Sequence, residues 1–431
     1  MASSSNALPT LAKYLSSLTT LRPPWKSFSE QFPNGLVAVV GNESADVDSI
    51  ACALAYAWWL TVGPQKEGEI RGGGGGGGDE REGQKGRPAC VPMIQILREE
   101  LGLRGDAVHL LKTLGLDMSG VWFAEEMGEG EKEFGKENGE GKGIFSVVLV
   151  DHNQMGKSLA SLVSAAKGHV EEIVDHHADE GLYREWVGEG RRCIQTAGSC
   201  ASLVALRILK RTADDGPIDR GDVAWLDENV RRLLLAPILL DTANLLPAAG
   251  RATGADKEAA GRLAEGLLGE EETARWHGEL LEKKADVASL TPRQLLLKDY
   301  KQWTLGKVEC GIASMPVKLS VAAEPSRGQM ADDMAAFRQQ RSLDILVVNT
   351  LFTEADVFAR ELLLLGPEQL VESTDGYLQA HTDFDLVPLL VPSLSAPDGL
   401  HLRVYTQRNL LASRKQIQPA LANFYLQSES E

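Results

Sequence analysis

The sequence has few of the features that mark disulfide-rich, membrane-spanning or nucleic-acid-binding proteins. Its 431 residues include five cysteines, an odd number without Cys-x-x-Cys spacing, which predicts a reducing compartment. The longest apolar run, 233–240, is much shorter than the roughly 18 residues that span a bilayer. With 61 acidic and 44 basic residues, the net charge of −17 argues against nonspecific nucleic-acid binding. We therefore expect a soluble protein without membrane or nucleic-acid partners.

Two other familiar signals are missing. The glycine run 72–78 has no Gly-Lys-Ser/Thr ending and does not join a strand to a helix, so it is not a phosphate-binding loop. It lies within 63–87, and this segment and 127–142 are rich in Gly, Glu and Lys; we expect both to be disordered insertions. The first 24 residues lack the compact apolar core of a secretion signal and the Arg-rich face of a transit peptide, so they are expected to begin the fold.

The order of apolar segments predicts two domains. Strand-like and helical segments alternate through residues 1–284, which is typical of a parallel sheet covered on both faces. After residue 291 strand-like runs dominate, and 288–431 is predicted to be a smaller α/β domain. In the first domain we expect strands at 36–40, 91–97, 145–150 and 170–174, and helices at 48–60, 105–114, 158–167, 199–211, 222–240 and 256–284.

Polar clusters follow several of these apolar segments. They are Asp46-Val47-Asp48, Asp151-His152-Asn153, Asp175-His176-His177 and, after an apolar helix, Asp241. Taken singly, an Asp after a strand is more often a helix cap or a turn former than a ligand. Because the carboxyl ends of parallel strands meet at one edge of a sheet, the clusters together predict a shared metal site. Carboxylates dominate it, which favours Mn²⁺ or Mg²⁺ over Zn²⁺.

The four clusters resemble the ordered motifs of the DHH phosphoesterase superfamily, which includes family II inorganic pyrophosphatases and eukaryotic exopolyphosphatases. The match runs through residues 42–48, 151–153, 175–177 and Asp241. Two later segments, Asp299-Tyr300-Lys301-Gln302-Trp303 and Ser413-Arg414-Lys415-Gln416, resemble the phosphate-binding segments of the same branch. The resemblance implies an N-terminal parallel-sheet DHH domain, a smaller DHH-associated α/β domain, and an active site in the cleft between them.

The resemblance also implies roles for particular residues. Two divalent cations would share an attacking water, with Asp151 bridging the ions. Asp175 would orient a histidine ring, and His177 would face the scissile phosphate, so we expect His177, Asp151 and Asp175 to be catalytic. The predicted metal ligands are Asn42, Asp46, Asp48, Asp151, His176 and Asp241, and the predicted substrate-binding residues are His177, Lys301, Arg414 and Lys415.

One position separates the candidate substrates. Family II pyrophosphatases begin the first motif with His, whereas this chain has Asn42, as fungal-type exopolyphosphatases do. Animal prune-type relatives replace the second histidine of the third motif, but His177 is intact here. We therefore expect an active exopolyphosphatase that binds linear inorganic polyphosphate. The alternatives are an inorganic pyrophosphatase, a prune-like nucleotide phosphodiesterase, or a catalytically weak regulatory protein. We expect a cytoplasmic monomer, with an additional mitochondrial pool as an alternative.

Overall fold

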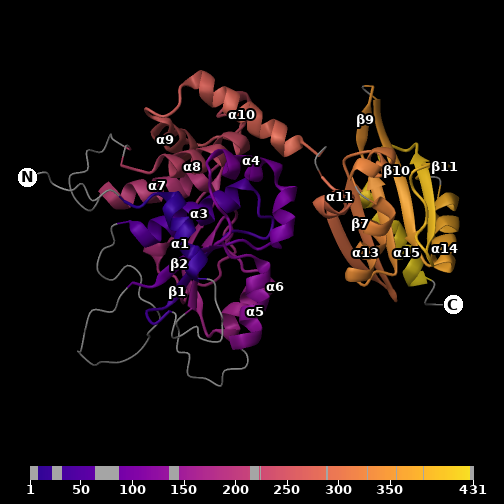
Figure 1. Ribbon diagram of the computed structural model, residues 1–431, viewed down its shortest axis with the longest axis horizontal. Helices are drawn as coiled ribbons and strands as arrows, with labels where there is room; N and C mark the ends of the chain where they lie inside the picture. The colour runs from indigo at the N-terminus through magenta and orange to yellow at the C-terminus, as the bar shows by residue number, and fades with distance from the viewer. Residues whose placement is uncertain are drawn as a thin grey trace, which may run out of the picture. The chain divides into compact units, whose positions relative to one another are not determined.

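In the computed structural model, the apolar runs that precede the acidic clusters form a five-stranded parallel sheet (Figure 1). Its strands are β1 (Leu36–Val40), β2 (Ala89–Met93), β3 (Phe145–Val150), β4 (His169–Asp175) and β5 (Arg192–Ile194), in the order β2-β1-β3-β4-β5. Every residue of β1 and β3 is buried, which explains their continuous apolar sequence, since a parallel sheet is covered on both faces.

The helices of this unit pack on both faces of the sheet. Helix α3 lies against β1 and β2, and α6 lies against β3. Because crossover connections are right-handed, the two helices cover opposite faces. The core contains the buried rings of Trp58, Trp59 and Trp122. The helices are α1 (Leu11–Ser17), α3 (Val47–Val62), α4 (Gly105–Thr113), α5 (Ala124–Phe134), α6 (Lys157–Ala165), α7 (Cys200–Ala213), α8 (Glu228–Asp241), α9 (Gly254–Ala264) and α10 (Glu270–Ala285), with short 3-10 helices η1 (Leu18–Leu21), η3 (Arg98–Leu103), η4 (Glu189–Arg191) and η5 (Pro247–Ala249).

The strand order creates a switch point between β1 and β3. The chain leaves β1 toward β2 on one side and leaves β3 toward β4 on the other. Doubly wound sheets bind their ligands beyond the carboxyl ends of the strands at such a point. The loops that follow β1 and β3 carry the first two predicted clusters, so the topology brings both of them to this position.

One predicted insertion is partly wrong. Residues 127–134 are helical and belong to α5, whose first turn contains Glu125 and Glu126. Acidic residues at this end interact favourably with the helix dipole, and α5 packs on α6 while Phe134 contacts Phe145, with ring centroids 6.2 Å apart. A Gly- and Glu-rich composition therefore did not prevent ordering, because one face had a surface to pack against. Residues 135–142, and all of the 63–87 segment except its two end residues, lie outside the described residues.

Three predicted elements also differ from the structure. The helix expected at 256–284 is two helices, α9 and α10, because Gly266 adopts a left-handed conformation with φ of 64° between them. Strand β2 ends at Met93, whereas the prediction extended it to residue 97. Helix α8 starts at Glu228, where the Asp227 side chain caps the Val230 N–H, and not at 222.

The second unit is built on a mixed seven-stranded sheet. Its order is β11-β12-β10-β8-β7-β6, with β9 paired to β10; β7 and β8 are parallel and the other pairs are antiparallel. The strands are β6 (Tyr300–Leu305), β7 (Val308–Met315), β8 (Ile345–Thr350), β9 (Phe352–Glu354), β10 (Val357–Gly366), β11 (Leu386–Pro388) and β12 (His401–Gln407). Apolar runs at 308–315, 343–351 and 402–405 predict β7, β8 and β12, whereas β6, β9, β10 and β11 were not predicted.

Helices cover both faces of this second sheet. Helices α11 and α13 share one apolar cluster with the sheet, and α14 and α15 share another on the opposite side. The unit therefore has its own core, and the predicted α/β architecture with an N-terminal parallel sheet is confirmed. Its helices are α11 (Pro292–Lys298), α12 (Leu319–Ala322), α13 (Met330–Gln340), α14 (Glu368–Ala380) and α15 (Arg414–Gln427), with the 3-10 helix η6 (Pro325–Arg327).

By its internal contacts the chain divides into the units Met1–Ala285 and Asp286–Glu431. The structure describes residues 8–21, 32–63, 87–134, 145–213, 223, 225–287, 290–327, 329–355, 357–381 and 383–427. Within these ranges, no helix combines the length and the apolar character that crossing a membrane requires.

Candidate metal centre

Strand register brings the predicted clusters side by side. Val40 pairs with Leu149, and Val150 pairs with Val174, so the residues after β1, β3 and β4 emerge at one edge of the sheet. A backbone hydrogen bond of 3.0 Å from the Asp151 N–H to the Val174 carbonyl continues the ladder past the end of β3. The clusters around residues 42, 151 and 175 are therefore neighbours because their strands are neighbours.

Asp151 is the central carboxylate of this edge. It is buried, and its φ of 63° is in the left-handed region, which a non-glycine residue adopts infrequently. Its Oδ2 accepts hydrogen bonds from Asn42 Nδ2 at 2.8 Å and from Ser49 Oγ at 2.7 Å. Its buried Oδ1 has no hydrogen-bond partner among the described residues. One oxygen is thus held by the protein, and the other is left for a ligand.

His176 presents a nitrogen to that oxygen. Its Nδ1 lies 3.0 Å from the Ala197 carbonyl, which requires a proton on Nδ1 and leaves the Nε2 lone pair exposed in the neutral ring. Nε2 lies 3.2 Å from Asp151 Oδ1. Ligands at right angles on one cation, each about 2.1 Å from it, lie about 3.0 Å apart. The pair therefore has the separation that a shared metal ion needs.

The electrostatics of His176 agree with this arrangement. Burial by itself lowers the pKa of the imidazole, but the carboxylates of Asp151 and Asp48 outweigh burial and raise the pKa to about 9. In the metal-free protein a proton can therefore occupy Nε2. A divalent cation would replace that proton, since it satisfies the same two lone pairs with more charge.

Asp175 lies behind the histidines. Its Oδ1 accepts hydrogen bonds from the backbone N–H and Nδ1 of His177, both within 3.2 Å, and its Oδ2 accepts one from Asn153. Although burial raises the pKa of this carboxyl group, these hydrogen bonds outweigh burial and lower it. Asp175 is thus an ionised carboxylate that orients His177, as its predicted role requires.

His177 is the exposed member of the cluster. Its side chain is 56% exposed, and its Nδ1 lies 2.8 Å from Asp175 Oδ1. Its Nε2 has no partner in the described part of the chain. Asp151, His176 and His177 each offer a ligand atom within 4.8 Å of the others, the spacing of a metal-binding group. The first two are oriented toward each other, whereas His177 is free to meet a substrate.

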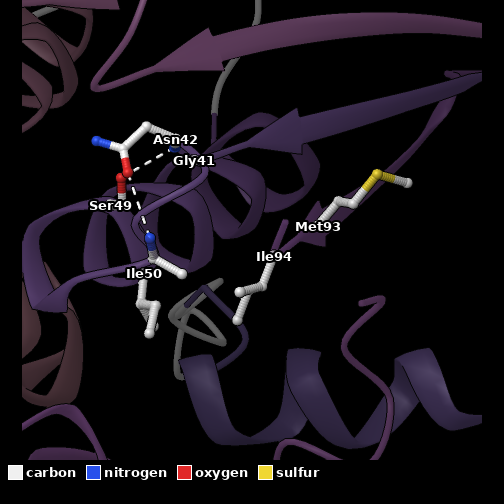
Figure 2. Close-up of a pocket in the computed structure, with 7 residues that line it drawn as sticks. Gly41, Asn42, Ser49, Ile50, Met93 and Ile94 are labelled. Atoms are coloured by element: carbon white, nitrogen blue, oxygen red, sulfur yellow. Dashed lines mark hydrogen bonds between the residues drawn. The ribbon is translucent and has the colours of Figure 1, made fainter. Parts of the chain in front are cut away.

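The loop after β1 supports Asp151. The Asn42 amide oxygen accepts hydrogen bonds from the backbone N–H and the hydroxyl of Ser44, while its nitrogen donates to Asp151. Figure 2 shows Asn42 beside Ser49 and Ile50 of α3, and across from them lie Met93 and Ile94, which line the same pocket. In this arrangement Asn42 holds Asp151, and its assignment as a metal ligand stays a prediction.

Asp46 and Asp48 have different surroundings, although they are two residues apart. Asp46 caps α3 by accepting a hydrogen bond from the Ser49 N–H. Asp48 is buried and accepts hydrogen bonds from the Cys200 and Ala201 N–H groups and from Ser199 Oγ, so it binds the N-terminus of α7. Burial, followed by repulsion from nearby carboxylates, raises the pKa of Asp48 well above its usual value.

Asp241 completes the acidic group from the end of α8. Three residues that follow it, 243–245, all have left-handed φ values, so the chain turns sharply after the helix. Burial, followed by repulsion from Asp46, raises the pKa of Asp241 to about 7, and Asp151 adds to the shift. Four carboxylates and a histidine thus share one region, and their repulsion is what a divalent cation would relieve.

Several supporting residues were not predicted as site residues. Ser49 donates to Asp151, and Asn153 links Asp175 to the Ala178 carbonyl. Asp256 accepts hydrogen bonds from the Gly198 and Ser199 N–H groups at the start of α7. Ser49 and Asn153 lie within or beside the recognised motifs, so the sequence could have indicated them as site residues. The N–H groups of Gly198 and Ser199 are 58 and 57 residues from Asp256, and no local pattern indicates these two contacts.

The predicted phosphate-binding residues lie in the second unit. Arg414 begins α15, and its guanidinium donates to the Asp299 carbonyl at 2.9 Å and to the Asp299 carboxylate at 2.6 Å. Lys301 is exposed on β6. The segments around 299–303 and 413–416 are therefore adjacent within the unit, and their joint role in substrate binding stays a prediction. The side chain of Lys415 lies outside the described residues.

Comparison with known proteins matches both units. The family model described as the DHH family N-terminal domain matches residues 36–238, and the DHHA2 domain model matches residues 278–424. Exopolyphosphatase PRUNE1 of Rattus norvegicus is 31% identical over 389 residues, covering 90% of this chain and 74% of that protein. A Schizosaccharomyces pombe protein provisionally named an exopolyphosphatase is 27% identical over 400 residues, covering 91% of this chain and 92% of that protein.

A relative with lower sequence identity matches about half of the chain. The manganese-dependent inorganic pyrophosphatase of Methanothrix thermoacetophila is 24% identical over 223 residues, which cover 51% of this chain and 64% of that protein.

Proposed function

The chain belongs to the DHH family, and from that membership we propose that it is a metal-dependent exopolyphosphatase that removes the terminal phosphate of linear inorganic polyphosphate. The rat relative, whose name states this activity, matches 90% of the chain. The observation that carries the proposal is the pair formed by Asp151 Oδ1 and His176 Nε2, which lie 3.2 Å apart at a position where a divalent cation would replace the shared proton.

We assign two divalent cations, Mn²⁺ or Mg²⁺, to the edge of the parallel sheet. When bound, such cations lower the pKa of a coordinated water and neutralise charge on the phosphoryl oxygens. The Methanothrix relative is named for manganese, which supports a divalent cation of this kind. The residues assigned to hold the cations are Asp46, Asp48, Asp151, His176 and Asp241.

Asp175 and His177 act on the substrate side. The Asp175 carboxylate accepts a hydrogen bond from His177 Nδ1–H and fixes the orientation of the imidazole ring. In its protonated form His177 then presents Nε2–H to a phosphoryl or leaving-group oxygen. This hydrogen bond would strengthen as negative charge develops on that oxygen. The exposure of the ring, 56% of the side chain, leaves room for a phosphate.

Cations of the second unit bind the rest of the substrate. Arg414 offers a planar guanidinium, which can bind two phosphate oxygens at once, and the carboxylate of Asp299 holds it in place. Lys301 and Lys415 add point charges. This assignment rests on the DHHA2 match and on the proximity of Arg414 to Asp299.

Asn42 favours polyphosphate over pyrophosphate. Its amide is committed to Asp151 and Ser44, so the first motif supplies one imidazole ligand fewer than the pyrophosphatase version would. An inorganic pyrophosphatase is the second candidate, because a named pyrophosphatase matches about half of the chain. Monomeric state and cytoplasmic location stay predictions from the sequence.

Phosphate release tests the proposal directly. Pyrophosphate, tripolyphosphate, long polyphosphate and a cyclic nucleotide would be compared with Mn²⁺, Mg²⁺ or a chelator. We expect metal-dependent release from both polyphosphates, little from pyrophosphate, and none with the chelator. A preference for pyrophosphate would favour the second candidate, and cleavage of the cyclic nucleotide alone would indicate a phosphodiesterase. No release from any substrate would favour a regulatory protein and contradict the proposal.

A further inference from the structure

Arg104 donates hydrogen bonds to the loop that follows β1. It lies where η3 meets α4, and its Nε and Nη2 both donate to the Ser44 carbonyl, Nε at 3.0 Å. The backbone at this junction is closely packed, because a Cβ on the neighbouring Gly105 would lie 2.4 Å from the Lys283 carbonyl oxygen of α10. The guanidinium therefore extends from a fixed point and holds one carbonyl with two donors.

Further hydrogen bonds connect the Arg104–Ser44 contact to Asp151. The Ser44 N–H and hydroxyl lie 2.9 Å and 2.7 Å from Asn42 Oδ1. Asn42 Nδ2 in turn donates to Asp151 Oδ2 at 2.8 Å, and the opposite oxygen of that carboxylate is the one without a partner. The path from Arg104 to Asp151 therefore consists of three consecutive contacts.

The loop needs such support. Ala45, the residue after Ser44, has a φ of 46°, a left-handed conformation that costs an alanine of the order of 1 kcal/mol. Ala45 is buried in the core, but Ser44 is exposed, so hydrogen bonds and not packing hold Ser44. Arg104 supplies two of these hydrogen bonds from outside the loop.

We propose that Arg104 is a positioning residue of the metal site, which acts through Ser44 and Asn42 to fix the direction of the Asp151 carboxylate. The inference rests on the proposed metal site. Lysine cannot replace the arginine, because an ammonium group on a flexible stem does not reproduce two donors in a fixed plane. The identity of this side chain, and not its charge alone, therefore sets metal affinity.

The test compares Arg104→Lys with Arg98→Lys. Arg98 is a matched control, because its guanidinium also makes two hydrogen bonds to backbone carbonyl oxygens of the same unit, those of Met118 and Val121, and its contacts among the described residues do not include the loop. Mn²⁺ binding would be measured without substrate, by the electron paramagnetic resonance signal of free Mn²⁺. Loss of a group that orients a ligand typically weakens metal binding about 10–100-fold. We expect this loss in Arg104→Lys and a change below about 3-fold in Arg98→Lys.

Further measurements separate positioning from other roles. At saturating Mn²⁺, Arg104→Lys should lower kcat for tripolyphosphate with little change in KM. Ser44→Ala removes the hydroxyl hydrogen bond to Asn42 Oδ1 and keeps the backbone N–H contact and the carbonyl that Arg104 binds. It should weaken Mn²⁺ binding in the same direction but less, and the double variant should show less than additive loss. Wild-type Mn²⁺ affinity in Arg104→Lys, or a change in KM alone, would overturn the inference. A wild-type protein that binds no Mn²⁺ would instead refute the proposed function.

Discussion

At the scale of single residues, the site depends on which hydrogen bonds each carboxylate oxygen accepts. Asp151 has one oxygen held by Asn42 and Ser49 and the other unpaired, whereas both oxygens of Asp175 accept hydrogen bonds from the protein. Two aspartates at equivalent strand ends thus have different roles. The difference arises from their neighbours, because the side chains themselves are identical.

Replacement of Asp151 by Asn should abolish turnover and leave the fold intact. The amide has nearly the same shape, but it removes the negative charge that a cation requires. Because loss of supporting groups alone costs about 10–100-fold, we expect phosphate release from tripolyphosphate to fall by more than about 100-fold. Asp117→Asn is a matched control, since this exposed aspartate binds only Ser119 among the described residues. An active Asp151→Asn protein with a normal circular dichroism spectrum would contradict the mechanism.

Metal affinity should increase with pH. Burial and nearby carboxylates raise the pKa of Asp241 to about 7, and the carboxylates around His176 outweigh its burial and raise its pKa to about 9. Both groups must lose a proton to bind a cation, so the Mn²⁺ affinity should rise from pH 6 to pH 9. Calorimetry in two buffers of different ionisation enthalpy would measure the protons released. Equal affinity across this range would contradict the assignment of these ligands.

The raised pKa of Asp241 also makes the stability of the metal-free protein depend on pH. The folded state keeps a proton on Asp241 from its ordinary pKa of 3.8 up to about 7, so this group's contribution to the free energy of unfolding falls as pH rises through that window. Asp241→Asn removes this dependence. As the pH rises from 4 to 7, we expect the free energy of unfolding of the wild-type protein to fall relative to that of the variant. Urea unfolding in the presence of a chelator would measure both.

At the scale of elements, the N-terminus of α7 is held by two carboxylates. Asp48 binds the Cys200 and Ala201 N–H groups, and Asp256 binds those of Gly198 and Ser199. The first turn of a helix has N–H groups without intrahelical partners, and these two aspartates satisfy them. Helix α7 thereby connects α3, which carries Asp48, to α9, which carries Asp256.

Replacement of Asp256 by Ala should destabilise the first unit. It would leave three backbone N–H groups and two hydroxyls without their acceptor, and unsatisfied buried donors cost about 1–3 kcal/mol each, so we expect a loss of at least about 3 kcal/mol. Thr253→Ala removes only one cap of α9, and its loss should be about 1 kcal/mol. Urea unfolding would measure both. Equal losses in the two variants would show that Asp256 does not secure α7.

At the scale of the whole molecule, the chain divides its chemistry between two units. The assigned metal ligands all belong to Met1–Ala285, and the predicted phosphate-binding cations belong to Asp286–Glu431. Each unit has its own apolar core, which is the usual condition for independent folding.

A fragment that ends at residue 285 should therefore bind metal without catalysing hydrolysis. We expect its Mn²⁺ affinity to lie within a few-fold of the full chain, because all assigned ligands are present. Its tripolyphosphate hydrolysis should fall by at least about 100-fold, since Arg414 and Lys301 are missing. The isolated second unit is the control for folding, and the two fragments mixed together test whether the units must be linked. Hydrolysis by the first fragment alone would contradict the assigned role of the second.

Sequence alone was sufficient for the parallel sheet and for the neighbourhood of the site. Strands β1 and β3 are continuous apolar runs, and polar residues that end such runs must meet at one edge of the sheet. The motifs at 151–153 and 175–177 lie close together, and Asp151, His176 and His177 each offer a ligand atom within 4.8 Å of the others. The roles assigned to these residues stay predictions. The sequence prediction was less reliable where composition was ambiguous. Residues 127–134 are rich in Gly and Glu but form part of α5, which packs against α6.

Only the tertiary structure decided what each polar residue does. Asp48 and Asp151 both follow the pattern of an aspartate near a strand end, yet one binds the start of α7 and the other presents an unpaired oxygen to His176. The hydrogen bonds from Asn42 to Asp151 and from Ala201 to Asp48 join residues 109 and 153 positions apart. Local sequence specifies strands, helices and their order, because backbone preferences are local. Hydrogen-bond partners across the fold are settled by packing, which no short motif contains.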